Sequence, residues 1–214
     1  MANINVRPIA VGAINTNCYV TYDEDTLCGV IIDPGDDAGR IKMLIEDLKI
    51  KPEAILLTHG HFDHILACGD LVNLYHIPIY IHEDEKDLIM DAYLNCSQSF
   101  SGSGYAIEPS ILVKDGQSLD LTGTKINVIH TPGHTKGCCC YYFSDARLLF
   151  SGDTLFMESV GRTDLPTGNS SKIISSINEK LFVLDDDVRV FPGHGPSTSI
   201  GYEKRNNPYA DGLN

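Results

Sequence analysis

Three histidines and one aspartate stand close together in the stretch 58–64, where they form the pattern H-x-H-x-D-H. Neutral imidazole nitrogens and carboxylate oxygens are both ligands of divalent ions such as zinc and iron. Because the whole chain has only 8 histidines in 214 residues, this density favours a metal site over a polar surface loop. We therefore predict metal chemistry at His59, His61, Asp63 and His64.

Three further residues could contribute to the same chemistry, namely His134, Asp153 and His194. Each lies at the expected end of a strand, and a glycine beside each histidine permits a tight turn that aims its side chain into a shared cleft. Taken alone, each is most simply a turn residue. Together with the stretch 58–64, they favour one common metal site.

The hydrophobic pattern indicates alternating strands and helices that would position these residues. Segments 8–14, 17–22 and 28–33 are rich in residues typical of strands, and apolar residues at every third or fourth position predict helices over 38–49 and 65–75. Further strands are predicted over 54–57, 77–82, 111–113, 125–130, 137–143, 147–150 and 188–191, and further helices over 83–95 and 169–182. The metal motif would thus follow a strand, where ligands usually bind in α/β layers.

The segment 97–110 is polar and rich in glycine. It lacks the Lys-Ser/Thr of a phosphate-binding loop, so we interpret it as a surface loop or lid. Three consecutive cysteines at 138–140 fall in a predicted strand, where alternate side chains face opposite ways, so we expect buried core residues. His76 and His82 are expected in solvent or helix-cap roles, while His130 could orient a ligand.

Composition limits the class of protein. The length fits a single domain, assigned here as 1–214, and the net charge of −13 disfavours nucleic acids and anionic membranes as partners. The seven cysteines are an odd number, and no segment has the pattern of a signal peptide or a membrane span. We expect a reduced, cytoplasmic protein whose oligomeric state the sequence does not indicate.

Taken in order, the motif at 58–64 and the turns at His134, Asp153 and His194 resemble the metallo-β-lactamase fold, in its small single-domain, glyoxalase II-like (hydroxyacylglutathione hydrolase-like) branch. The segments 161–164 and 203–209 are similar to the same branch. The resemblance implies an α/β protein with a four-layer αββα sandwich and a site along one edge of its two sheets.

The resemblance also implies two divalent metal ions, most simply Zn²⁺, although iron and manganese suit the same ligands. His59, His61 and His134 would hold the first ion, Asp63, His64 and His194 the second, and Asp153 would bridge them. Two ions ~3.5 to 4 Å apart can share one hydroxide near neutral pH. Asp63 would in addition act catalytically, by orienting that hydroxide.

The expected reaction is hydrolysis of a small acyl thioester such as S-lactoylglutathione by the hydroxide that bridges the metals. A thiolate leaves readily at neutral pH, so no separate protein acid is needed. Arg162 could contact an anionic substrate, or it could pair with Asp164. Glyoxalase II enzymes proper carry an added carboxyl-terminal helical region that grips glutathione, and its absence here leaves the thiol carrier open.

Two alternatives stay open at this point. Persulfide dioxygenases have similar motifs and use a single iron, so the chain could be a mononuclear-iron dioxygenase. It could also be a metal-binding interaction module without turnover.

Overall fold

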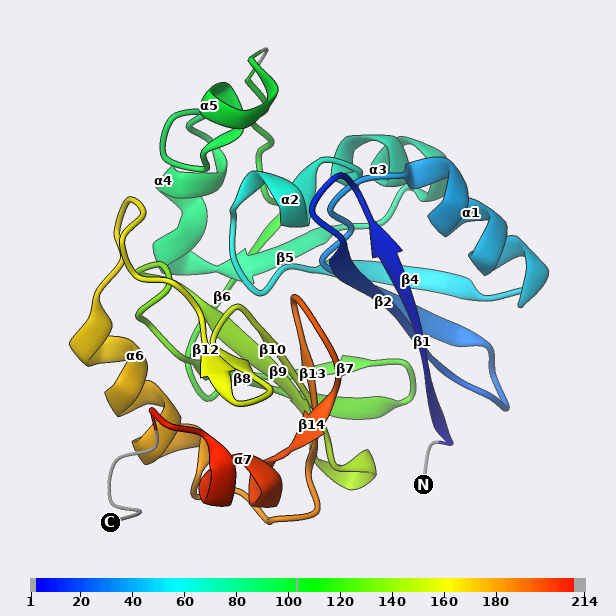
Figure 1. The fold of residues 1–214 in the computed structure, drawn as a ribbon. Helices are drawn as coiled ribbons and strands as arrows, with labels where there is room; N and C mark the ends of the chain where they lie inside the picture. The colour runs from blue at the N-terminus through cyan, green and yellow to red at the C-terminus, as the bar shows by residue number, and fades with distance from the viewer. Residues whose placement is uncertain (1–2, 103, 210–214) are drawn as a thin grey trace.

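The computed structural model describes residues 3–102 and 104–209, in which two six-stranded sheets face each other and helices cover their outer faces (Figure 1). The strand orders are β1-β2-β3-β4-β5-β6 in the first sheet and β14-β13-β10-β9-β8-β7 in the second. Helices α1 and α3 lie on the first sheet, and α6 and α7 lie on the second. This arrangement confirms the predicted αββα sandwich.

The first half of the chain forms the first sheet and its helices. Its strands are β1 (Ile4–Val11), β2 (Thr16–Asp23), β3 (Cys28–Ile32), β4 (Lys51–Leu56), β5 (Ile79–His82) and β6 (Ile111–Val113). Its helices are α1 (Ala38–Asp47), α2 (Phe62–Ile65), α3 (Cys68–Tyr75), the 3-10 turn η1 (Glu83–Glu85), α4 (Lys86–Ile89) and α5 (Ser97–Ser101). β1, β2 and β3 pair antiparallel, and β3 to β6 pair parallel.

The second half forms the facing sheet. Its strands are β7 (Ser118–Leu121), β8 (Thr124–His130), β9 (Cys139–Phe143), β10 (Leu148–Gly152), β13 (Arg189–Pro192) and β14 (Thr198–Ser199), and the short hairpin is β11 (Leu155–Phe156) with β12 (Ser159–Val160). Its helical segments are η2 (Ser144–Ala146), α6 (Ser170–Ser176), the π-helical η3 (Ile177–Leu181) and α7 (Ile200–Asn206). α6 and η3 connect the parallel strands β10 and β13.

Most predicted elements are present, with shifted ends, but two predictions were wrong. The predicted helix 83–95 ends at Ile89, because the Asp91 carboxylate accepts hydrogen bonds from the backbone N–H groups of Tyr93 and Leu94 and so stabilises a turn instead. The predicted loop 97–110 contains helix α5, whose start is fixed by a hydrogen bond from Ser97 N to Asn95 Oδ1. Ser103, in the same segment, lies outside the described residues.

Apolar side chains fill three layers, one between the sheets and one under the helices on each side. Aromatic rings form the centre of the layer between the sheets: Phe150 lies 5.2 Å from Tyr19 and 5.1 Å from Phe191, centroid to centroid. Cys139 packs in this layer and Cys140 in the layer under α6, as the alternation of a strand requires. All three consecutive cysteines are buried and free, which confirms their interpretation as core residues.

Replacing Phe150 by alanine should lower the free energy of unfolding by about 3–5 kcal/mol, because it leaves a cavity between the sheets. Urea denaturation followed by circular dichroism measures this change. Val183→Ala is the control, since this side chain is 70% exposed and its loss should change stability by less than about 0.5 kcal/mol. Equal effects of the two substitutions would contradict the packing described here.

Candidate metal centre

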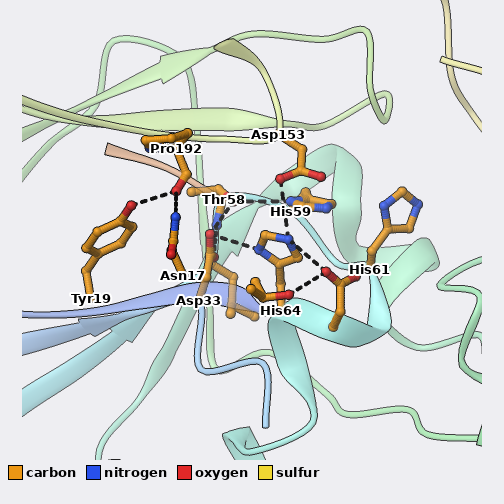
Figure 2. Close-up of polar contacts among 12 residues, drawn as sticks. Asn17, Tyr19, Asp33, Thr58, His59, His61, His64, Asp153 and Pro192 are labelled. Atoms are coloured by element: carbon orange, nitrogen blue, oxygen red, sulfur yellow. Dashed lines mark hydrogen bonds and ion pairs between the residues drawn. The ribbon is translucent and has the colours of Figure 1, made fainter. Parts of the chain in front are cut away.

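The structure brings together all seven predicted ligands at one edge of the two sheets. They come from the four segments that follow β4, β8, β10 and β13, the first of which includes helix α2: His59, His61, Asp63, His64, His134, Asp153 and His194. Figure 2 shows the side chains of His59, His64 and Asp153 meeting between the two sheets, with His61 beside them. Residues up to 135 positions apart, such as His59 and His194, therefore share one site.

A first group of donors consists of His59, His61 and His134, whose ligand atoms all lie within 4.8 Å of one another. His61 Nδ1 is 2.8 Å from His134 Nε2. Burial, together with repulsion from the neighbouring imidazoles, holds the pKa of His59 and of His61 well below the ordinary value. Both rings are therefore neutral near pH 7, which is the form that binds a metal ion.

A second group consists of Asp63, His64 and His194. Asp63 Oδ2 lies 3.3 Å from His64 Nε2 and 3.2 Å from His194 Nε2. Burial alone would lower the pKa of His64, but the carboxylates of Asp63, Asp33 and Asp153 outweigh it and raise that pKa. This group thus has an excess of negative charge that calls for a cation, either a proton or a metal ion.

Asp153 lies between the two groups. Its Oδ2 is 3.6 Å from His134 Nε2 in the first group and 3.7 Å from His194 Nε2 in the second. Its Oδ1 is 3.5 Å from His64 Nε2. A single carboxylate therefore reaches both groups, as the predicted bridging ligand must.

Several of these donor atoms are buried without a hydrogen-bond partner in the described part of the chain. They are His59 Nε2, His61 Nε2, His64 Nε2 and Asp153 Oδ1. An unsatisfied buried polar atom costs about 1–3 kcal/mol, so several in one place indicate that something else satisfies them. Divalent ions fit, because the donor set is of imidazole nitrogen and carboxylate oxygen.

Asp33 stabilises the centre through contacts with Thr58 and His64 (Figure 2). From the sequence it was interpreted only as part of a strand end and turn. Its buried carboxylate accepts hydrogen bonds from Thr58 N at 2.8 Å and from Thr58 Oγ1 at 2.7 Å. Its Oδ2 also lies 3.0 Å from His64 Nδ1. Asp33 thereby fixes both the start of the motif and the ring orientation of one predicted ligand. An acidic residue directly after an apolar strand was the signal available in the sequence.

Glu85 is a second supporting carboxylate that the sequence did not reveal, because it stands in an acidic run typical of a solvated helix start. It is fully buried and accepts hydrogen bonds from Gly60 N at 2.9 Å and Gly137 N at 2.8 Å. Gly60 separates His59 from His61, and Gly137 follows the His134 turn. Glu85 therefore joins the two loops that carry the first donor group.

The remaining histidines have other roles. His76 is the carboxyl-terminal cap of α3 in a left-handed conformation, and His82 Nδ1 accepts a hydrogen bond from Asp84 N at the start of η1, which confirms the cap roles expected for them. His130 stacks on His82 with 4.0 Å between ring centroids, and its Nε2 lies 3.0 Å from Lys136 O. These contacts of His130 involve none of the predicted ligands.

A cleft of about 490 Å³ opens at the centre. Arg162 lines it, and the Arg162 carbonyl oxygen lies 2.7 Å from His134 Nδ1, so this backbone helps to orient a predicted ligand. The Arg162 guanidinium makes two hydrogen bonds to the Asp164 carboxylate, at 2.7 and 2.8 Å. Of the two roles considered from sequence, pairing with Asp164 is the one seen.

Comparison with known proteins agrees with this geometry. Residues 11–194 match the model of the family described as "Metallo-beta-lactamase superfamily". The chain belongs to this superfamily.

Several curated relatives match nearly the full chain, including two that are named as hydrolases. The probable metallo-hydrolase YqgX of Bacillus subtilis is 38% identical over 97% of this chain and 98% of its own, and the hydroxyacylglutathione hydrolase GloC of Haemophilus influenzae is 34% identical over 96% and 98%. These relatives support the coarse assignment as a metal-dependent hydrolase.

Solved structures show the same fold. The BLEG-1 B3 metallo-beta-lactamase has a TM-score of 0.93 at 38% identity and covers 97% of this chain and 100% of its own. TTHA1623 in a di-iron-bound form has a TM-score of 0.85 at 35% identity, and the match covers 95% of this chain and 100% of its own. ETHE1 from Myxococcus xanthus has a TM-score of 0.79 at 28% identity, and the match covers 95% of this chain and 83% of its own.

Among the described residues, no helix combines the length and apolar character needed to cross a membrane.

The stacked pair of His82 and His130 should make stability depend on pH. Burial and repulsion from His130 lower the pKa of His82 from 6.5 to about 4, so the unfolded chain takes up a proton at a higher pH than the folded chain does. Stability from this source is complete above pH 6.5 and is lost as the pH falls toward 4. We expect a loss of about 1–2 kcal/mol between pH 7 and 5.

Urea denaturation at both pH values measures this loss, and His82→Gln should reduce it. His76→Asn is the control, because His76 is exposed and asparagine tolerates its left-handed backbone. Identical pH dependence in wild type and His82→Gln would refute this explanation.

Proposed function

We propose that the protein hydrolyses a small acyl thioester, with S-lactoylglutathione as the first example to test, at two divalent ions, most simply Zn²⁺. The observation that supports this most strongly is that Asp153 reaches both donor groups at the floor of a cleft. The similarity to GloC, which is named a hydroxyacylglutathione hydrolase, supports the choice of substrate class.

His59, His61 and His134 would hold one ion, Asp63, His64 and His194 the other, with Asp153 shared. When bound, the ions would supply a hydroxide nucleophile shared between them and Lewis-acid stabilisation of the oxyanion that develops on the substrate. The chain's own residues supply position and proton handling. Asp33 and Glu85 hold the loops that carry these donors, so the site is ordered before substrate arrives.

Asp63 is the proposed catalytic residue. Although burial opposes ionisation, His64 and His194 hold the pKa of the Asp63 carboxyl well below its usual range, so it is a carboxylate at neutral pH. Thr16 Oγ1 donates a hydrogen bond to its Oδ2 at 2.8 Å, and the residue lines the cleft. Asp63 can therefore accept a hydrogen bond from an attacking water or hydroxide and set its direction.

A thioester suits this site because its thiolate leaving group needs no protonation by the protein. Apart from the proposed metal ligands, the described residues that line the cleft include no lysine, tyrosine or further histidine that could donate a proton to a poorer leaving group. Phe62, Phe156 and Leu165 are among the apolar lining residues, and they limit access of bulk water to the reacting carbonyl.

Persulfide dioxygenation at a single iron is the second candidate, and the di-iron-bound form of TTHA1623 is the observation that keeps iron in consideration. A one-metal reaction gives no role to the group of Asp63, His64 and His194, so we rank hydrolysis first. Oxygen uptake with a glutathione persulfide and about one iron per chain would favour the dioxygenase. A non-catalytic metal-binding module would show neither reaction.

Asp63→Asn should lower kcat for thioester hydrolysis by about 10²–10⁴-fold, because the neutral amide is a weaker metal ligand and a weaker acceptor of the orienting hydrogen bond than the carboxylate. A thiol-trapping dye and a panel of acyl thioesters measure this with the metal-loaded protein. Asp120→Asn, on exposed β-strand surface, is the matched control and should keep full activity. Chelation of the metal should abolish turnover in both proteins.

Circular dichroism and the metal content of each variant show whether a loss of activity comes from the missing carboxylate or from a loss of the fold or of bound metal. The proposal is wrong if the metal-loaded wild type turns over none of the thioesters, or if Asp63→Asn retains wild-type kcat.

A further inference from the structure

The first half of the chain contributes three large apolar residues to the cleft, namely Ile14 and the aromatic residues Phe62 and Phe100, called here the aromatic wall. The rings of Phe62 and Phe100 are stacked, with centroids 4.9 Å apart and an angle of 12° between their planes. Phe100 is nevertheless 63% exposed and Ile14 is 50% exposed. Large apolar side chains that gather at a cleft and stay open to solvent typically mark a binding surface.

Within the aromatic wall, Phe62 and Phe100 are held in place by the hydrogen bonds of the segment that carries Phe100. Phe62 N donates to Asn95 O at 2.9 Å, which ties the metal motif to this segment. The buried Asn95 side chain donates to Tyr105 O at 2.7 Å and accepts from Ser97 N at 2.9 Å, so it joins both ends of the segment around α5. A surface that is formed in advance loses little conformational entropy when it binds a ligand.

The second half of the chain also contributes apolar residues to the cleft, namely Phe156, Val160 and Leu165. Arg162 is the one lysine or arginine among the described residues of the lining. Its guanidinium makes two hydrogen bonds, and both go to the Asp164 carboxylate. This pairing with Arg162 lowers the pKa of Asp164 to about 2, so the pair is ionised at neutral pH. The one guanidinium of the described lining is therefore already paired with a carboxylate, and the net charge of −13 on the chain further disfavours a carrier such as glutathione with two remote carboxylates.

We propose that the aromatic wall makes this site selective for thioesters with a long or aromatic apolar acyl group on an uncharged thiol carrier. This inference rests on the proposed thioesterase function and narrows it away from S-lactoylglutathione, whose acyl group is polar and whose carrier is anionic. Ile14 and Phe100 would be the residues that determine specificity, since they contact the acyl group without touching the reacting carbonyl. Asp164 would select against anionic carriers by neutralising the charge of Arg162.

The test compares kcat/KM for the octanoyl and acetyl thioesters of N-acetylcysteamine, a neutral carrier. The wild type should prefer octanoyl by about 10-fold or more, the scale on which small apolar differences are discriminated. Phe100→Ala should remove most of this preference by raising the KM for the octanoyl thioester. It should change kcat/KM for the acetyl thioester by less than about 2-fold. Ile14→Ala is a second variant with the same expected direction, in case Phe100→Ala does not fold.

Tyr93→Ala is the matched control, since Tyr93 precedes α5, is 73% exposed and does not line the cleft. It should leave the octanoyl preference unchanged. Equal kcat/KM for octanoyl and acetyl in the wild type, or an unchanged preference in both wall variants, would overturn the inference while leaving the proposed function standing. Hydrolysis of neither thioester, nor of S-lactoylglutathione, would overturn both.

The charge component is tested with S-octanoylglutathione. The wild type should hydrolyse it less efficiently than the neutral octanoyl thioester, and Asp164→Asn should raise its kcat/KM severalfold by releasing Arg162, with little change for the neutral substrate. A wild-type preference for the glutathione thioester would overturn the inferred selection of an uncharged carrier.

Discussion

Burying imidazoles and carboxylates together at one edge of two sheets has a free-energy cost, because each leaves water and several gain no hydrogen bond from residues 3–102 and 104–209. His59, His61 and His64 are almost fully buried and have orphaned nitrogens, and the carboxylates beside His64 add unbalanced negative charge. Two divalent ions would remove both costs at once. Metal binding would then stabilise the fold as well as provide the chemistry.

The rest of the architecture keeps these donors in place. Hydrogen bonds cross between the two halves close to the centre: Cys139 N donates to Thr58 O at 2.9 Å, and Asn17 N donates to Gly193 O at 2.7 Å. Tyr19 Oη adds a bond to Pro192 O at 2.6 Å (Figure 2). Each of these bonds lies next to a loop that carries a predicted ligand. The first half of the chain therefore fixes the ligand-bearing loops of the second half, and the second half fixes those of the first.

The sequence was sufficient to select the residues that the structure brings together and to predict the layers, because residue type and apolar periodicity are local properties. It was insufficient where structure depends on distant partners. The buried roles of Asp33 and Glu85 depend on backbone groups far along the chain, such as Gly137. Short elements such as β7 and α7 have too little apolar pattern to be predicted, and the segment around α5 is closed by a hydrogen bond from the Asn95 side chain to Tyr105 O. The pairing of Phe62 with Phe100 follows from that closure.

The central claim is that one chain holds two metal ions between the two sheets. Anomalous diffraction from crystals of the metal-loaded protein locates such ions directly. We predict two peaks about 3.5–4 Å apart, one among His59, His61 and His134 and the other among Asp63, His64 and His194, with the Asp153 carboxylate between them. A single peak, or two peaks away from these side chains, would contradict the claim.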